Sequence, residues 1–295
     1  MLFYQGFWYL SFAFQGIISF QSHFEAHDTD ILLASLPKTG TTWLKSLLYA
    51  IVNRENISKN HSKHPLHTKN PHELVPQLGL NQPETIAQVP SPRLFATHVP
   101  YSSLPESIKT SNCRIVYVCR NPLDTFVSSW HYFLQFEISK ETKPDKEMME
   151  EYLIKYSKGV SPYGPHDEHV LEYWKESIQN PTKVLFLEYE GLKKEPKAHL
   201  IRLAEFLGFP FSADEKDNVV DEILELCSIK NLKEMEVNKS GQWFPWVENK
   251  YLFRKGEVGD WVNHLTPSMA KQFDQMQENL KKAGFSSKYY QILKS

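Results

Sequence analysis

Short apolar runs and amphipathic stretches alternate along most of this chain. Four runs rich in β-branched and aromatic residues, at 31–35, 93–97, 115–119 and 184–187, have the length and composition of buried strands. After the first run, apolar residues recur every three or four positions, as in an amphipathic helix: Leu44, Leu47, Leu48 and Ile51. Strands that alternate with helices predict an α/β fold, with a central parallel sheet flanked by helices.

The bulk composition indicates a globular protein and argues against several classes of partner. The chain has 295 residues and neither an internal repeat nor a long linker, so we expect a single domain over residues 1–295. Hydrophobic residues make up 41% and the net charge is only −2, which argues against a nucleic-acid-binding surface. Three separate cysteines (Cys113, Cys119 and Cys227) disfavour a disulfide framework and favour a reducing, cytoplasmic compartment.

The first twenty residues carry no charge and could be mistaken for a signal peptide or a membrane span. No Lys or Arg precedes the apolar run, however, and polar or small residues such as Gln5, Gly6 and Gln15 interrupt it. Its many aromatic residues also suit a pocket wall better than a lipid-facing helix. We therefore expect a buried segment of the fold and no membrane anchor.

Histidines recur at ligand-like spacing in two places, at His23 and His27 and at His61, His64 and His67. The second set lies in a stretch rich in Lys, Asn and Ser, which is typical of a solvated surface loop. Neither set is joined by a second cluster that could supply further ligands. We therefore expect no metal site.

Polar residues follow each predicted strand closely. Lys38 lies in the loop after the first strand, His98 follows the second, Arg120 the third, and Glu188 and Tyr189 the fourth. The carboxyl ends of parallel strands line the ligand crevice of an open α/β sheet. The sequence therefore predicts that these side chains converge on one site.

Residues 36–43 (LPKTGTTW), here called the cradle loop, join the first strand to a helix. Gly40 permits close backbone approach, and the helix N-terminus offers free N–H groups; hydroxyl donors come from Thr39, Thr41 and Thr42. Since Lys38 precedes the glycine, this is not a Walker A loop. The pattern favours a phosphate cradle, although the loop on its own also fits an ordinary capped strand-to-helix turn.

Two further basic segments extend this candidate anion site. Arg120 is followed by a helix start, and Ser128 falls on the helix stripe that faces the same crevice. Residues 254–261 (RKGEVGDW), here called the basic loop, combine two cations with glycine in a mobile anion clamp: Arg254, Lys255 and Gly256. Taken singly, the first segment also fits a capped helix with a surface arginine, and the second a solvated charge pair.

Four motifs together resemble the signature segments of the cytosolic sulfotransferase family, most closely its plant members. In chain order they are PKTGTTW (37–43), FATHVPYSSLP (95–105), CRNPLDTFVSSW (119–130) and RKGEVGDW (254–261). The match runs from about Tyr4 to the C-terminus. The resemblance implies a P-loop-like strand-loop-helix and a metal-free enzyme, which moves a sulfuryl group from 3′-phosphoadenosine 5′-phosphosulfate to a hydroxyl group of a small acceptor.

The resemblance also implies a role for each matching position. The 5′-phosphosulfate end of the donor would bind along the cradle loop, at Lys38, Thr39, Gly40, Thr41, Thr42 and Trp43, with Trp43 against the adenine. The 3′-phosphate would bind at Arg120, Ser128, Arg254, Lys255 and Gly256. A nucleotide-contacting tyrosine and the adenine pocket correspond to Tyr189, Cys227, Ser228 and Ile229. His98 matches the catalytic base.

The chain departs from the family pattern in several respects, among them Ala96 and Val262, which stand where members often have lysine. Ile229 stands where a phenylalanine is usual, which removes one aromatic face from the adenine. The C-terminal dimer motif of animal members is not apparent, so the oligomeric state stays open. The chain also begins where members usually have several dozen residues behind them, so we expect a truncated N-terminus relative to the family.

The chemistry expected of His98 follows from its residue type. A neutral imidazole can remove the proton of an alcohol or phenol near pH 7, while Lys38 stabilises charge on the departing phosphate. Two alternatives stay open. A nucleoside or shikimate kinase would need a Walker lysine and a Mg²⁺ carboxylate, and neither is evident. A nucleotide-binding protein that has lost catalysis would not need His98 and Lys38.

The identity of the acceptor is not determined by the sequence. Aromatic residues could form an apolar pocket for a flat or fused-ring molecule: Phe3, Phe7, Trp8, Phe12, Tyr101, Phe133, Trp243, Phe244 and Trp246. Core packing is the alternative for about half of them. A flavonoid, steroid, phenolic hormone or desulfoglucosinolate would each suit such a pocket.

Overall fold

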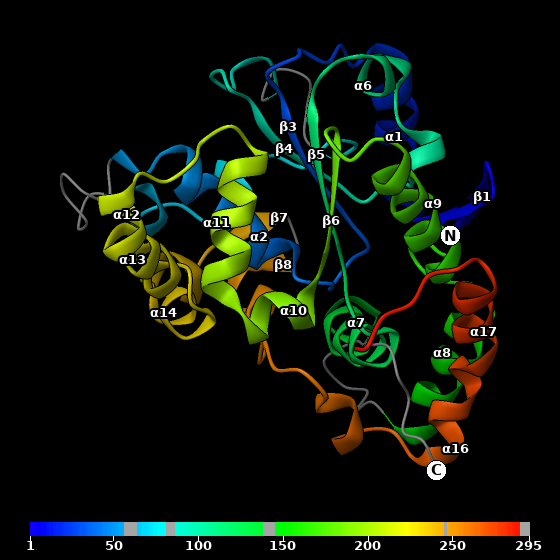
Figure 1. Cartoon of the computed structure of the whole chain (residues 1–295). Coiled ribbons are helices and arrows are strands. Elements are labelled where there is room, and N and C mark those ends of the chain that lie inside the picture. The colour runs from blue at the N-terminus through cyan, green and yellow to red at the C-terminus, as the bar shows by residue number, and fades with distance from the viewer. Residues whose placement is uncertain (56–63, 81–85, 138–144, 245–246, 290–295) are drawn as a thin grey trace.

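A four-stranded parallel sheet forms the centre of the computed structural model, which describes residues 1–55, 64–80, 86–137, 145–244 and 247–289 (Figure 1). The strands are β3 (Ile31–Ser35), β4 (Leu94–Thr97), β5 (Arg114–Cys119) and β6 (Val184–Glu188). Their order is β4-β3-β5-β6, and each neighbouring pair is parallel. The α/β class and the four strands expected from the sequence are confirmed, with every boundary within one residue.

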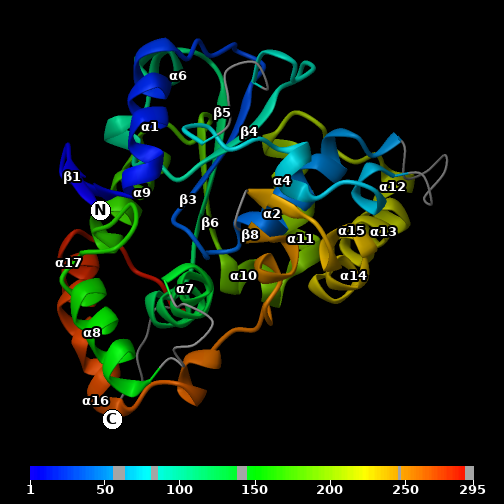
Figure 2. The same cartoon turned by 180° about the vertical axis from the view of Figure 1, so that it is seen from behind.

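Helices cover both faces of this sheet, as Figures 1 and 2 show from opposite sides. Alternate strand residues such as Leu33 and Val116 pack on one face against α2 (Thr41–Val52), α10 (Tyr189–Lys194), α11 (Pro196–Phe206) and α13 (Val219–Leu226). Their neighbours Leu32 and Ile115 pack on the other face against α1 (Ser11–His23), α6 (Glu106–Thr110) and α9 (His166–Gln179). Burial on both faces explains why these strands are apolar throughout.

A third apolar cluster lies beyond the carboxyl ends of the strands (Figure 1). It joins α7 (Pro122–Glu137), α8 (Lys146–Ser157), α16 (Pro267–Ala270) and α17 (Asp274–Lys282) around the buried Phe126 and Phe273. Trp261 of the basic loop packs into the same cluster, which anchors that loop beside α7. Smaller elements are α4 (Pro71–Leu74), α12 (Ala213–Asp217), α14 (Ile229–Glu234), α15 (Glu236–Lys239), β7 (Gln242–Phe244) and β8 (Val247–Glu248).

The N-terminal segment folds as an antiparallel pair, β1 (Leu2–Tyr4) and β2 (Phe7–Tyr9), followed by α1. Phe7 and Tyr9 are buried in the core, whereas Phe3 and Phe12 are 61% and 54% exposed. The N-terminal segment is therefore buried on one face, as expected from the sequence, and exposed to solvent on the other. Among the described residues, no helix has the length and apolar character needed to cross a bilayer.

Candidate functional site

The cradle loop makes a sharp turn between β3 and α2. Lys38 and Gly40 both have left-handed backbone conformations, with φ of 69° and 109°. A Cβ atom on Gly40 would lie 2.6 Å from Cδ2 of Tyr189, so the turn requires glycine at this position. α2 begins at the next residue, Thr41, and its first N–H groups have no partner within the helix. These donors and the positive end of the helix dipole suit an anion.

The hydroxyl groups of the cradle loop differ in what they contact. Thr39 donates to the carbonyl oxygens of Leu36 and Val118, at 2.8 and 3.2 Å, and is fully buried. Thr41 pairs with the Ser35 hydroxyl at 2.7 Å. The Thr39 side chain thus braces the loop against β5, and its hydroxyl hydrogen is directed to these carbonyl oxygens and not into the turn, where the sequence-based expectation placed it.

His98 follows β4, and its ring is held in one tautomer. Nδ1 lies 2.7 Å from the carbonyl oxygen of Ser35. A carbonyl oxygen only accepts, so Nδ1 carries the ring proton and Nε2 keeps its lone pair. Burial lowers the pKa of His98 to about 3; the Ser35 bond opposes this shift, and nearby Lys45 and Lys38 add to it. The ring is therefore neutral at pH 7 and able to accept a proton at Nε2.

Lys38 lies against an aromatic ring. Its Nζ is 4.0 Å from the ring centroid of Tyr132 on α7, and no described carboxylate lies within ion-pair distance of it. Burial, together with repulsion from Arg254 and Arg120, lowers the pKa of Lys38 to about 7. A nearby anion would favour the charged form of this side chain.

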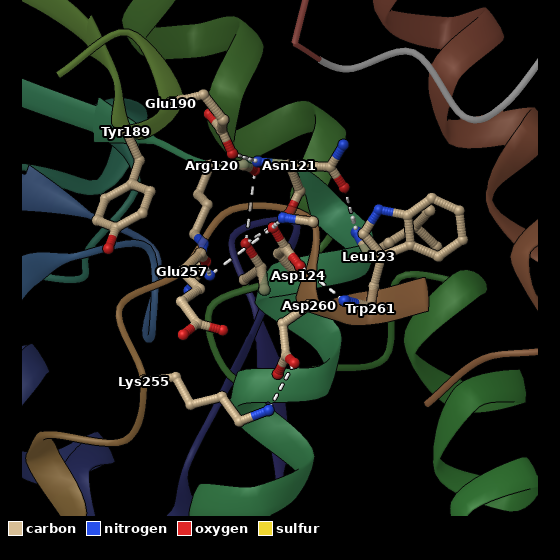
Figure 3. Close-up of polar contacts among 12 residues, drawn as sticks. Arg120, Asn121, Leu123, Asp124, Tyr189, Glu190, Lys255, Glu257, Asp260 and Trp261 are labelled. Atoms are coloured by element: carbon tan, nitrogen blue, oxygen red, sulfur yellow. Dashed lines mark hydrogen bonds and ion pairs between the residues drawn. The ribbon is translucent and has the colours of Figure 1, made fainter. Parts of the chain in front are cut away.

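Arg120 links three segments of the site. Its guanidinium donates to the carbonyl oxygen of Glu257 at 2.7 Å and lies 3.7 Å from the carboxylate of Asp124 (Figure 3). It also donates to the carbonyl oxygen of Lys38 at 3.4 Å. The same group lies 4.7 Å from the ring centroid of Tyr189. Arg120 thereby ties the cradle loop and the basic loop to the end of β5.

The basic loop is fixed to the N-terminal turn of α7. Asp124 accepts hydrogen bonds from the backbone N–H groups of Gly259 and Trp261, at 2.7 and 3.0 Å. Asp260, whose carboxylate is fully buried, accepts from Lys255 at 2.7 Å (Figure 3). It also accepts from Arg254 at 2.6 Å. Although burial acts to raise the pKa of Asp260, the bonds from Lys255 and Arg254 hold it below its usual range.

One cavity joins these groups at the carboxyl ends of β3, β4, β5 and β6. Of the sequence-based candidates, those that line it are Lys38, Gly40, Thr41, Thr42, Trp43, His98, Arg120, Ser128, Tyr189, Ile229, Arg254 and Gly256. Its cations and helix N-terminus surround a space next to a neutral histidine. The arrangement can hold a doubly anionic ligand and offer a base to a second molecule.

Comparison with known proteins agrees with this geometry. The model of the sulfotransferase domain matches residues 28–284. The chain belongs to the sulfotransferase family. It is 46% identical to cytosolic sulfotransferase 13 of Arabidopsis thaliana over 92% of this chain and 82% of the relative, and 47% identical to cytosolic sulfotransferase 11 over 92% and 78%. These names agree with the cytoplasmic location and the plant-type resemblance expected from the sequence.

Solved structures show the same sulfotransferase fold. A putative steroid sulphotransferase of Arabidopsis thaliana superposes with a TM-score of 0.75 at 37% identity, over 96% of this chain and 87% of that one. Mouse sulfotransferase SULT7A1, solved in complex with PAP, gives a TM-score of 0.72 at 27% identity, over 95% and 94%. The fold and the transferase class inferred from the sequence are thus confirmed.

Four candidate residues lie away from the wall of the cavity in this sulfotransferase. Cys227 is fully buried in the apolar core, and the Ser228 hydroxyl caps α14 by accepting from the Asn231 N–H. Thr39 faces the backbone, as described above, and Lys255 points to Asp260. Their side chains do not contribute to the cavity wall, so any contact with a nucleotide would come from their backbone or from a rearranged side chain.

The sequence analysis missed the polar cavity residues Tyr132 and His72 and the apolar ones Leu252 and Phe253. Tyr132 lies one helical turn after Ser128 on α7, so the helix spacing alone could have indicated it. His72 comes from α4, which follows no strand, and nothing in its local sequence pointed to the site. Within the described residues, no group of three or more potential metal ligands is present; His61 lies outside that part of the chain.

Proposed function

We propose that this sulfotransferase uses 3′-phosphoadenosine 5′-phosphosulfate as its donor and a hydroxyl group of a small aromatic or fused-ring molecule as its acceptor, in the cytosol. The family membership establishes the class of enzyme, and the residues that line the cavity supply the proposed roles. We also propose that residues 1–295 act as one domain, because two apolar clusters pack on the faces of one sheet and the third lies beyond the carboxyl ends of its strands.

The donor fits the unsatisfied polar groups of the cavity. Among the described residues, the Nε atoms of Arg120 and Arg254 are buried without a hydrogen-bond partner. Buried N–H groups of this kind are costly unless an acceptor satisfies them, and phosphate oxygens are strong acceptors. Arg120, Ser128 and Arg254 would hold the 3′-phosphate, and the N-terminus of α2 with Lys38 the 5′ end. Trp43 and Ile229 would flank the adenine.

The observation that carries the proposal is the placement of His98 beside the cradle loop. With its proton fixed on Nδ1 by the Ser35 carbonyl, Nε2 is free to take the proton of an acceptor hydroxyl. The donor supplies the sulfuryl group. Lys38 and the N–H groups of α2 would then stabilise the negative charge that develops on the departing nucleotide.

The proposed acceptor class rests on the aromatic side chains of the cavity wall. Tyr132 and Trp243 line the cavity beside His98, and a flat ring could pack between such side chains. The similarity to a plant protein described as a putative steroid sulphotransferase supports a fused-ring acceptor. Flavonoids, steroids, phenolic hormones and desulfoglucosinolates form the panel to be tested. Trp246, which the sequence analysis also considered, lies outside the described residues.

The test is the transfer of labelled sulfate from 3′-phosphoadenosine 5′-phosphosulfate to this panel. We expect transfer to at least one class of hydroxyl, and a loss of kcat of roughly 10²- to 10⁴-fold in His98→Ala, because the variant lacks the base. His23→Ala, on the far end of α1, is the matched control and should keep full activity. Tight nucleotide binding without transfer to any acceptor would instead indicate an inactive nucleotide-binding protein.

A further inference from the structure

Lys45 is a fully buried lysine directly behind the cradle loop, on the first turns of α2. Its Nζ donates to the carbonyl oxygen of Val75 at 2.9 Å and lies 3.1 Å from Nδ1 of His72. No described carboxylate forms an ion pair with it. A lysine in this position is costly to bury, so its polar contacts call for a functional explanation.

His72 connects this lysine to the cavity. Its Nε2 lies 2.9 Å from the hydroxyl of Thr42, and its ring packs against Trp243 with centroids 4.5 Å apart. The Asn70 side chain accepts from the His72 N–H and so fixes the start of α4. Lys45, His72 and Thr42, here called the relay, therefore form a continuous chain of hydrogen bonds from the core to the cavity.

Two directions of hydrogen bonding fit these distances. In one, Thr42 donates to His72 and His72 donates to a neutral Lys45 amine. In the other, Lys45 donates to Nδ1, Nε2–H donates to the Thr42 oxygen, and the Thr42 hydrogen is free to point outward. A phosphate oxygen beside Thr42 can only accept, so an anion in the cradle loop selects the second direction.

We propose that Lys45 and His72 are positioning residues that make the Thr42 hydroxyl a donor to the anionic 5′ group seated in the cradle loop. This inference rests on the proposed function, since it requires a 5′-phosphate at that loop. The lysine always has a hydrogen to offer to His72, whereas an apolar residue would leave the ring free to adopt the other tautomer. The relay thereby orients a hydrogen that Thr42 alone could point either way.

The protonation of the relay agrees with this role. Burial lowers the pKa of Lys45 well below its usual value. Burial also lowers the pKa of His72, and the basic neighbours Lys45, His98 and Lys38 act in the same direction. The Lys45 amine carries N–H hydrogens whether or not it is charged, so the relay works through the orientation of hydrogens and needs no fixed charge.

The experiment compares two nucleotides that differ only in the 5′ group, by calorimetric titration of the full chain. Adenosine 3′,5′-bisphosphate occupies the cradle loop, whereas adenosine 3′-phosphate does not reach it. We expect Lys45→Met to weaken binding of the bisphosphate by roughly 10- to 100-fold and to leave binding of the 3′-phosphate unchanged. Ser46→Ala is the matched control, because this buried hydroxyl bonds only to the helix backbone.

A double-mutant cycle distinguishes the relay from a general loss of structure. Because Lys45 acts through Thr42, Lys45→Met should have little further effect on the bisphosphate in a Thr42→Val background. His72→Gln, whose amide can still donate toward Thr42, should retain more affinity than His72→Leu. A thermal melt shows whether Lys45→Met folds. If it does not, the comparison of His72→Gln with His72→Leu tests the relay in its place.

Three outcomes would overturn the relay. They are unchanged bisphosphate binding in Lys45→Met, equal weakening of both nucleotides, and additive effects in the Thr42→Val background. A different result tests the proposed function itself: if the unmodified protein binds the two nucleotides equally, no 5′-phosphate sits in the cradle loop. That result would reject both the donor site and the relay.

Discussion

The cradle loop and the basic loop present cations to the same cavity, but their charges are balanced in different ways. In the basic loop, Arg254 and Lys255 share the carboxylate of Asp260, and Arg120 lies beside Asp124. Near the cradle loop, Lys38 contacts an aromatic ring, and Lys45 contacts a histidine and a carbonyl oxygen. No described carboxylate pairs with either of these two lysines.

This difference in charge balance explains why the pKa of Asp260 in the basic loop and that of Lys38 in the cradle loop are shifted by different causes. Hydrogen bonds from Lys255 and Arg254 hold the pKa of Asp260 below its usual range, so an ionised carboxylate faces both cations. Burial without a counter-ion lowers the pKa of Lys38 to about 7, so its charge depends on what occupies the cavity. The basic loop is therefore arranged in advance, whereas the cradle loop relies on its ligand to complete the charge balance.

Removing the cation of the cradle loop should have the largest effect. Lys38→Met should lower kcat by roughly 10²- to 10³-fold, because the charge on the departing nucleotide loses its stabilising partner. Steady-state kinetics with labelled donor measure this loss. Lys183→Met, at the opposite end of the sheet, is the control and should retain activity. If Lys38→Met lowered only the affinity for the donor, Lys38 would be a binding residue without a role in transfer.

Removing Arg120, which contacts the basic loop, should weaken nucleotide binding more than it slows sulfuryl transfer. Arg120→Met should weaken binding of adenosine 3′-phosphate by roughly 10- to 100-fold, because a bidentate donor to the phosphate is lost. Calorimetric titration checks this expectation. Arg114→Met, at the other end of the same strand, is the matched control. Equal affinities in the two variants would place the 3′-phosphate elsewhere.

The pH dependence should separate the two loops. Above pH 7, Lys38 loses its proton unless an anion restores it, because its pKa is lowered to about 7. Affinity for adenosine 3′,5′-bisphosphate should therefore fall between pH 7 and 9, by up to about tenfold per pH unit, with uptake of a proton. Affinity for adenosine 3′-phosphate should stay level. Titrations in two buffers of different ionisation enthalpy measure the uptake, and its absence would show that Lys38 stays charged throughout.

The smallest effect concerns a buried carboxyl group beside Arg120. Glu190 accepts from the Asn121 N–H at 2.8 Å (Figure 3), and burial raises its pKa to about 7 from an ordinary 4.5. A raised carboxyl pKa costs stability as the pH rises through this window. Glu190→Gln, which keeps the acceptor, should therefore raise the free energy of unfolding at pH 8 by about 1–3 kcal/mol and leave it nearly unchanged at pH 4.5.

Urea unfolding at the two pH values measures this difference. Glu225→Gln, on the exposed side of α13, is the control. The free energy of unfolding of this variant should not show the gain at pH 8 that is expected for Glu190→Gln. A Glu190→Gln protein that was equally affected at both pH values would indicate that a hydrogen bond was lost instead of a charge.

The sequence by itself determined the sheet and the ends of its strands. Apolar runs of four to six residues are buried on both faces, so their pattern marks β3, β4, β5 and β6 directly, and Lys38, His98, Arg120 and Tyr189 follow from where these strands stop. The sequence also pointed to Gly40, because glycine in a strand-to-helix turn permits close approach of the backbone to a ligand.

Only the tertiary structure decided which side chains face the cavity. Thr39 and Thr42 look alike in the sequence, yet one donates to buried carbonyl oxygens and the other faces His72. Cys227 lies in the core, although it was expected near the adenine. His72 and Lys45 meet because α4 packs beside α2, a contact between segments distant in the chain. The periodicity of the sequence shows which residues are apolar and therefore buried. The hydrogen-bond partners of polar residues depend on how distant helices and strands pack together, and this packing cannot be read from the local sequence.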